Sequence, residues 1–279
     1  MPIGFHVSIA GGLPLAVKRA VELGCGTMQI FSHSPRTWKL DDIPVQAAAE
    51  FRAAREEAGI APLFVHTSYL INLASQDPAL YKRSIDALRT EMLRADLIDA
   101  EYVVTHLGVC SSCGHEDGVR LVAEALALAT DGLRTKTRLL LENTSGERGD
   151  IGYAFEDIAA IITMSGVDSL GVTVDTCHSY GAGYDIKSRK GLDGVVSLIE
   201  RTFGLERVKL IHLNDSKGAL GRRRDRHEHI GKGELGRQAF RNILNHPKLR
   251  DVPFIMETPK DSPDVDMVNM AVVRKLMRG

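Results

Sequence analysis

The chain has 279 residues and a formal charge of −1 at pH 7, with 35 Lys and Arg against 36 Asp and Glu. Hydrophobic residues make up 44% of it and charged residues 25%, which is close to the average of globular proteins. This composition excludes a disordered chain and a fibrous repeat. The balanced charge gives no global basic field, so any nucleic-acid contact has to come from a local patch.

The cysteines and the first residues indicate an intracellular protein. Four cysteines in a chain of this length are too few for a disulfide framework and suit a reducing compartment. The N-terminal residues lack the basic and apolar segments of a secretory signal, and no apolar stretch approaches the ~18 residues of a membrane span. We therefore expect a cytoplasmic protein with no membrane contact. Without a linker or a shift in composition, we expect one domain over residues 1–279.

Eight short apolar runs alternate with longer segments of helical spacing. The runs are rich in Val, Ile and Leu, which is typical of strands buried on both faces of a parallel sheet. Eight alternations of strand and helix predict an α/β fold, a (β/α)₈ or TIM barrel. A doubly wound open sheet is the alternative, although it usually has fewer strands. The expected strands are Ile3–Ser8, Thr27–Phe31, Pro62–His66, Tyr102–His106, Arg138–Glu142, Leu170–Asp175, Val208–Leu213 and Pro253–Glu257.

Two of the helices have clear sequence signals. Pro14–Leu23 and Ala79–Leu97 both have helical spacing of apolar residues. The second follows Asp77-Pro78, in which an N-cap residue precedes a proline at the first helical position.

Six consecutive expected strands place a histidine or an acid at or beside their C-terminal ends. Burying an unpaired charge inside the barrel is costly, whereas the C-terminal mouth of a TIM barrel is where active sites form. Any one of these residues alone could be structural, but six at one rim indicate a metal site. They are His66, His106, Glu142, Asp175, His212 and Glu257.

Two loops add further ligand-type residues over the same rim. His178 follows Asp175 by three positions, and Asp225 and His227 lie in the loop after the seventh strand. Imidazole with carboxylate suits zinc or manganese better than calcium. Nine such residues exceed the capacity of one ion, so two or three ions are implied, with Glu142 as the natural bridging ligand. Clustered divalent ions indicate phosphate-ester chemistry.

Several motifs resemble those of endonuclease IV, the zinc-dependent apurinic/apyrimidinic (AP) endonuclease family. The resemblance extends from His6–Gly12 to Met256–Thr258, which is nearly the whole chain. The motifs are His66-Thr-Ser-Tyr-Leu-Ile-Asn-Leu73, Gly171-Val-Thr-Val-Asp-Thr-Cys-His178, His212-Leu-Asn-Asp-Ser-Lys217, Asp225-Arg-His227 and Ile230-Gly-Lys-Gly233.

This resemblance implies a TIM barrel that holds three zinc ions. It assigns His66, His106 and Glu142 to one ion. It makes Glu142 a bridge to a second ion, which Asp175, His212 and Glu257 also bind. It assigns His178, Asp225 and His227 to the third.

The resemblance also implies the reaction. The family hydrolyses the DNA phosphodiester 5′ to an abasic site, using a zinc-activated hydroxide oriented by Glu142, and leaves a 3′-hydroxyl and a 5′-deoxyribose phosphate. It acts on double-stranded DNA and tends to be monomeric. It flips the abasic nucleotide out of the helix, and the free energy of this step is lowest where base pairing is already lost.

Basic and apolar loop residues are the expected DNA contacts. Arg36, Tyr69 and Leu70 match the family's inserting positions, and an arginine with an apolar wedge suits entry into the minor groove. Local basic segments in the loops after the sixth and seventh strands are expected to contact phosphates. These segments contain Lys187, Arg189, Lys190, Arg222, Arg223, Arg224 and Arg226.

Other motifs carry less weight. Cys110-Ser-Ser-Cys113 is a redox pair, half of a metal site or an ordinary loop, and the last is favoured because no second CxxC accompanies it. Gly231-Lys-Gly233-Glu-Leu-Gly236 matches a dinucleotide fingerprint but follows a charged loop instead of a strand, so no such site is expected. His33, His115, His229 and His246 match no family ligand position, and we expect structural or surface roles for them.

Two other functions compete with the nuclease. A metal-dependent sugar isomerase or epimerase of the xylose-isomerase type shares strand-end histidine and acid ligands. It has no use for a third ligand set or for a wedge of Arg36, Tyr69 and Leu70. A DNA-damage binder without catalysis is the second, and it would have no reason to retain all nine ligand-type residues.

Overall fold

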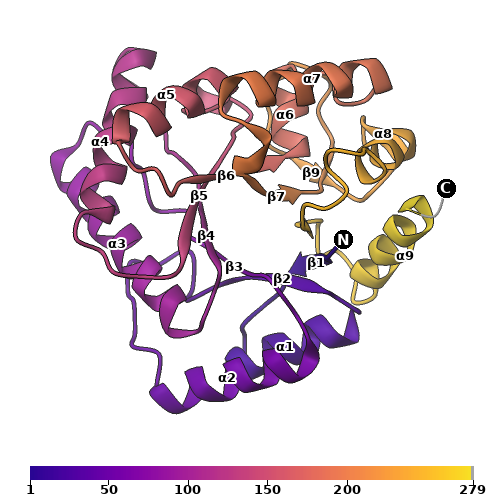
Figure 1. Ribbon diagram of the computed structural model, residues 1–279, viewed down its shortest axis with the longest axis horizontal. Coiled ribbons are helices and arrows are strands. Elements are labelled where there is room, and N and C mark those ends of the chain that lie inside the picture. Colours follow the sequence, from indigo (N-terminus) through magenta and orange to yellow (C-terminus); the bar gives the residue numbers. More distant parts are fainter. Residues whose placement is uncertain (278–279) are drawn as a thin grey trace.

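The computed structural model describes residues 1–277, and within them eight parallel strands close into a barrel in the order β1, β10, β7, β6, β5, β4, β3, β2. Helices surround the strands as an outer ring (Figure 1). The predicted TIM barrel is therefore confirmed. The barrel strands are β1 (Ile3–His6), β2 (Thr27–Phe31), β3 (Leu63–His66), β4 (Tyr102–Thr105), β5 (Arg138–Glu142), β6 (Gly171–Asp175), β7 (Val208–His212) and β10 (Phe254–Met256).

The helices follow the strands in turn, with two short 3₁₀ turns, η1 (Glu147–Gly149) and η2 (Leu205–Arg207). No helix within residues 1–277 is long and apolar enough to cross a membrane. The α-helices of the described chain are α1 (Leu13–Glu22), α2 (Val45–Ala58), α3 (Pro78–Leu97), α4 (His115–Thr130), α5 (Phe155–Ser165), α6 (Thr176–Ala182), α7 (Arg189–Thr202), α8 (Gly236–Leu244) and α9 (Val265–Met277).

The predicted element boundaries are close to those observed. Helix α3 begins one residue before the expected Ala79, and the carboxylate of Asp77 accepts hydrogen bonds from the backbone N–H groups of Ala79 and Leu80. His106 and Glu257 lie one residue beyond β4 and β10, so their placement inside those strands is corrected. The sequence did not predict the short antiparallel pair β8 (Asp215–Ser216) and β9 (His227–Glu228).

Five fully buried apolar side chains fill the inside of the barrel and form a core separate from the larger one between strands and helices. Tyr102 packs against this inner core, with its ring 5.3 Å from that of Phe64. The five residues of the inner core are Phe64, Val104, Leu140, Leu210 and Ile255.

Each of these inner residues lies two positions before a predicted metal ligand. Side chains alternate between the two faces of a strand, so residues two apart point the same way. Leu140 points into the barrel, so Glu142, two residues later, also points inwards, but nearer the C-terminal end. His212 follows Leu210 in the same way. The inner core thus forms the floor of the site and directs the ligands towards the barrel axis.

We expect Leu140→Ala to lower the free energy of unfolding by about 3 kcal/mol, because it opens a cavity in a fully buried core. Denaturant unfolding measures this change. Leu128→Ala on α4 is the control, since Leu128 is 58% exposed, and it should change stability by less than about 0.5 kcal/mol. Equal stabilities of the two variants would contradict a packed barrel interior.

Candidate metal centre

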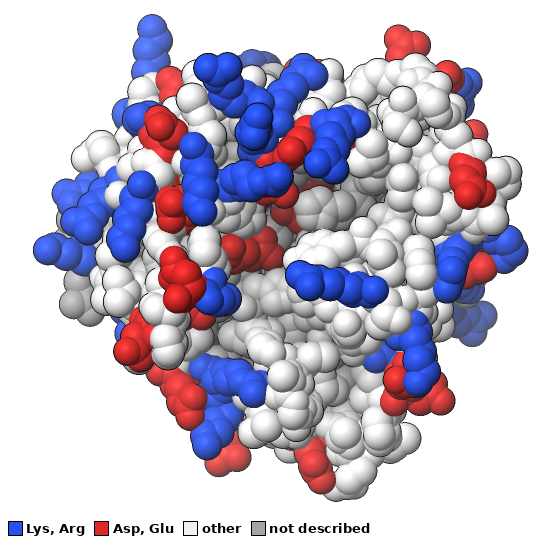
Figure 2. Space-filling view, turned by 180° about the vertical axis from the view of Figure 1, so that it is seen from behind, with Lys and Arg blue, Asp and Glu red and all other residues white. Residues whose placement is uncertain are grey.

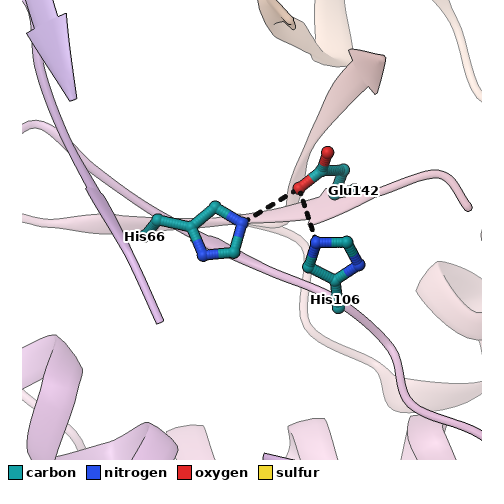
Figure 3. Close-up of side chains that lie close together, drawn as sticks. All are labelled: His66, His106 and Glu142. Carbon is teal, nitrogen blue, oxygen red and sulfur yellow. Dashed lines mark hydrogen bonds and ion pairs between the residues drawn. The ribbon is translucent and has the colours of Figure 1, made fainter. Parts of the chain in front are cut away.

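Glu142, at the end of β5, is the central residue of the site and is fully buried. Its Oε2 lies 3.2 Å from Nε2 of His66 and 3.5 Å from Nε2 of His106, and these three side chains converge from β3, from the residue after β4 and from β5 (Figure 3). Its Oε1 lies 2.9 Å from Nδ1 of His212 and 3.4 Å from Nδ1 of His178. One carboxylate therefore contacts four imidazoles.

The nine predicted ligands lie in three groups, and within each group one donor atom per residue falls within 4.8 Å of the others. Glu142 belongs to two of the groups, which is the geometry that a bridging carboxylate needs. A further combination uses Cys177, whose burial raises the pKa of its thiol to about 12 and so disfavours the thiolate that binds metal. The three groups are His66, His106 and Glu142; Glu142, Asp175, His212 and Glu257; and His178, Asp225 and His227.

Four of the five histidines are oriented by a hydrogen bond from one ring nitrogen to a carbonyl or amide oxygen. Nδ1 of His66 lies 2.8 Å from the carbonyl of Thr67, and Nδ1 of His178 lies 2.9 Å from that of Asn143. Nδ1 of His227 lies 3.0 Å from the carbonyl of Glu257. A carbonyl only accepts, so each of these three rings donates from Nδ1 and leaves Nε2 free for a cation.

His212, the fourth, has the opposite orientation. Its Nε2 lies 2.9 Å from Oε1 of Gln29, and its Nδ1 faces Glu142. Glu257 is 3.3 Å from the same Nδ1. Both ring nitrogens of His212 therefore have a partner: Nε2 contacts the amide of Gln29, and Nδ1 contacts the carboxylates of Glu142 and Glu257.

The charges of the site shift its pKa values strongly. Burial alone would lower the pKa of His212, but the charges of Glu257 and Glu142 raise it to about 9. Burial alone would raise the pKa of Glu142, yet His212 and His106 hold it well below its usual range. A cation that binds here must displace protons from the imidazoles, so its affinity falls as the pH falls.

The residues fit a group of divalent cations. Nε2 of His227 is buried without a hydrogen-bond partner, although Oδ1 of Asp225 is 3.3 Å away and Oδ2 of Asp175 is 3.7 Å away. An unpaired imidazole nitrogen between two carboxylates is costly unless a cation joins them. Imidazole and carboxylate donors in small sets suit zinc, with manganese as the next candidate.

The site opens into a cavity of about 760 Å³. His106, His178, His227 and Tyr69 are among the residues that line it. The face drawn in Figure 2 is hollowed near its centre, where acidic side chains show, and Lys and Arg side chains gather along one edge of the hollow. Such a layout attracts a polyanion to the rim and cations to the floor.

Four of the predicted DNA contacts, Arg36, Tyr69, Leu70 and Arg226, lie outside the ligand groups. Tyr69 is 62% exposed, Arg36 is exposed and Leu70 is half-buried. Arg226 is largely exposed, and its guanidinium lies 3.5 Å from Glu147. Three of the four therefore present side chains that a large substrate can reach.

Comparisons with known proteins identify the family. A family model described as a xylose isomerase-like TIM barrel matches residues 17–276. A relative from Methanoculleus marisnigri named probable endonuclease 4 is 44% identical over 278 residues, which are 98% of each chain. The chain belongs to the endonuclease 4 family.

Solved structures support this relationship. Endonuclease IV from Thermus thermophilus matches with a TM-score of 0.88 and 38% identity, over 100% of this chain and 99% of that one. A D-tagatose 3-epimerase-like protein matches with a TM-score of 0.72 but only 18% identity, over 99% and 97% of the two chains. The second likeness shows a shared fold, whereas the first lies within the endonuclease 4 family.

Three buried amides support the ligands of this endonuclease 4 family member, and the sequence did not predict them. The side-chain N–H of Gln29 on β2 donates to Oε1 of Glu257 at 2.7 Å. Asn214 donates from Nδ2 to Oδ2 of Asp175 at 2.6 Å, and Asn143 accepts from the backbone N–H of Asp175 at 2.7 Å. Asn143 and Asn214 each lie within two residues of a ligand, which is the signal that could have identified them.

The glycine motif encloses a carboxylate, which the sequence did not predict. The backbone N–H groups of Gly231, Gly233 and Gly236 donate to Oδ2 of Asp215 at 3.0 to 3.3 Å. A Cβ on Gly233 would lie 2.4 Å from the carbonyl oxygen of Ser216, so only glycine fits there. This contact fixes the loop that begins just after the predicted ligand His227.

Two expectations about the remaining residues have different outcomes. His33, His115, His229 and His246 each lie within 3.1 Å of a carboxylate outside the ligand groups, in agreement with structural roles. The interpretation of Cys110 and Cys113 as ordinary loop residues stays a prediction beside that of a redox pair, since their side chains lie next to each other. Their Cα atoms are 5.7 Å apart, at the turn that leads into α4, and this is a usual separation for a disulfide.

We expect Gln29→Leu to weaken zinc binding by about 10- to 100-fold, because His212 and Glu257 both lose the amide that orients them. Competition with a chromophoric chelator measures the affinity. Gln238→Leu makes the same change at an exposed position on α8 and should leave zinc binding unaltered. Unchanged affinity in Gln29→Leu would mean that the ligands hold their geometry without this support.

Proposed function

We propose that this protein is a DNA-repair endonuclease that hydrolyses the phosphodiester 5′ to an abasic site in double-stranded DNA. The products would be a 3′-hydroxyl and a 5′-deoxyribose phosphate. Three zinc ions would be held by the nine ligand-type residues, with manganese possible at one or more positions. The observation that carries the proposal is the meeting of all nine residues in three groups, two of which share Glu142.

The third group separates this proposal from sugar chemistry. His178, Asp225 and His227 come from α6 and the loop after β7, and they extend the site beyond the six residues at the strand ends. A sugar isomerase needs one or two ions and a compact pocket. The cavity of about 760 Å³ and the exposed Tyr69 beside it suit a large substrate better. The 44% identity to a probable endonuclease 4 also favours a nuclease.

The chain's own residues have defined parts in this reaction. Bound zinc supplies a lowered pKa for water and positive charge against the phosphate oxygens. Glu142, kept ionised by the surrounding imidazoles, would hold two of the ligand groups together and orient the attacking water. The apolar floor of Leu140 and Leu210 excludes bulk water from below, so that the charges act in a medium of low dielectric constant.

The lesion would be recognised by residues on the rim. Tyr69 and Leu70 would enter the DNA stack with Arg36 and occupy the space left by the flipped abasic nucleotide. Arg226 would contact a phosphate near the third group of ligands. Such contacts make binding depend on salt concentration.

We further propose that residues 1–279 act as one AP endonuclease domain, as a monomer and in the cytoplasm. Between residues 1 and 277, the ligands come from strands far apart in the sequence, from His66 on β3 to Glu257 after β10. A segment that lacked either strand would therefore lack part of the site.

We expect Glu142→Gln to reduce incision of abasic duplex by about a thousandfold, or about 4 kcal/mol in the barrier. The amide keeps the shape of the side chain but removes the charge that bridges two ligand groups. Incision of a labelled duplex and circular dichroism measure activity and fold. Glu200→Gln, at an exposed position on α7, should cut normally. Near-normal incision by Glu142→Gln would overturn the role of Glu142.

A further inference from the structure

Glu91, on α3, is a buried carboxylate outside the metal centre. Its side chain is 1% exposed. It has three hydrogen-bonding neighbours: the backbone N–H of Ser68 at 2.9 Å, Nε2 of His33 at 2.9 Å and Oγ of Ser32 at 3.2 Å. A carboxylate is costly to bury, and such a set of neighbours is what offsets the cost.

The three neighbours belong to two different loops. Ser32 and His33 begin the loop between β2 and α2, which carries Arg36. Ser68 lies in the loop between β3 and α3, which carries Tyr69 and Leu70. Glu91 therefore joins the two loops that carry the proposed inserting side chains.

The hydroxyl of Ser68 forms hydrogen bonds to both loops. It donates to the carbonyl of Pro35 at 2.8 Å, one residue before Arg36. The same hydroxyl accepts from the backbone N–H of Leu70 at 3.2 Å. The backbone of Ser68, held by Glu91, thus fixes the positions from which Arg36 and Leu70 project.

Helix α3 holds the first loop through two further residues. Arg94 donates from Nε to Oγ of Ser32 at 3.0 Å and from a terminal nitrogen to its carbonyl at 2.7 Å. The guanidinium of Arg83 lies 4.5 Å from the ring centre of Trp38. One helix therefore supports this loop at its start and again at Trp38.

We propose that Glu91 is a positioning residue for lesion recognition, which holds the loops of Arg36 and of Tyr69 and Leu70 in one fixed arrangement. Ordering two free loops at the moment of binding would reduce affinity for the lesion, and a preformed arrangement removes that cost. This proposal rests on the proposed function, because it needs a substrate into which these side chains insert. It concerns binding of the lesion and not the chemical step.

The test compares Glu91→Leu with the wild-type zinc enzyme on a duplex that carries one tetrahydrofuran abasic analogue. Single-turnover incision at rising enzyme concentration gives the half-saturating concentration and the maximal rate. We expect the half-saturating concentration to rise about tenfold, or about 1.4 kcal/mol, with the maximal rate within about twofold and zinc content unchanged. Glu91→Gln keeps a carbonyl oxygen for Ser68 and should recover most of the loss.

Glu101 provides the matched control. At the opposite end of β3 it accepts from the backbone N–H of Leu63 at 2.7 Å and pairs with Arg55 at 2.9 Å. Glu101→Leu should lower thermal stability but leave the half-saturating concentration unchanged. If Glu91→Leu does not fold, Ser68→Ala replaces it, since it removes only the hydroxyl between the loops and should shift the same parameter in the same direction.

The outcomes separate the two proposals. A wild-type enzyme that cuts abasic and undamaged duplex equally would overturn the proposed function and this inference with it. A wild type that prefers the abasic duplex, with variants at Glu91 and Ser68 that keep its half-saturating concentration, would overturn the inference alone. A fall in maximal rate or in zinc content with unchanged half-saturation would also overturn it, because Glu91 would then act on the metal centre.

Discussion

The alternation of side chains along a β-strand is the constraint on which the metal centre depends. Phe64, Leu140 and Leu210 are buried in the barrel interior, and the residues two positions later are His66, Glu142 and His212. Because all eight strands are parallel and close into one ring, these second residues converge on one axis. A shift of one residue in any strand would turn its ligand into the outer core. The apolar floor and the polar centre are therefore a single structural feature.

The site also depends on a balance of positive and negative charge among its side chains. Nine ionisable side chains would be unstable together in a buried space if they had one sign of charge. Here five imidazoles face four carboxylates. Each carboxylate lies close to a histidine, which lowers the free-energy cost of burying its charge. Carbonyl and amide groups behind the ring, such as those of Thr67 and Gln29, fix which nitrogen points inwards. The side chains of the site are therefore placed where they could hold divalent cations.

Much of the fold and of the ligand set could be predicted from the sequence, because both depend on local patterns. Continuous apolar runs marked the strands, and a histidine or an acid at or beside the ends of six of them marked the rim. Gln29 could not be predicted, since a glutamine within a strand has no distinguishing pattern and its partners lie 183 and 228 residues away. Glu91 was missed for a similar reason, because an acid on an amphipathic helix is usually exposed. Whether Cys110 and Cys113 can pair depends on the turn before α4, which the spacing of two cysteines alone does not determine.

The most direct test of the account is incision of an end-labelled duplex that carries a single tetrahydrofuran abasic analogue. Tetrahydrofuran cannot undergo β-elimination, so any cut at its 5′ side must be hydrolytic. The account predicts a single 5′ cut by zinc-loaded protein, its loss after prolonged chelation, and its return when zinc is restored. An intact duplex after incubation with fully zinc-loaded protein would contradict the account and make a metal-dependent sugar isomerase the leading alternative.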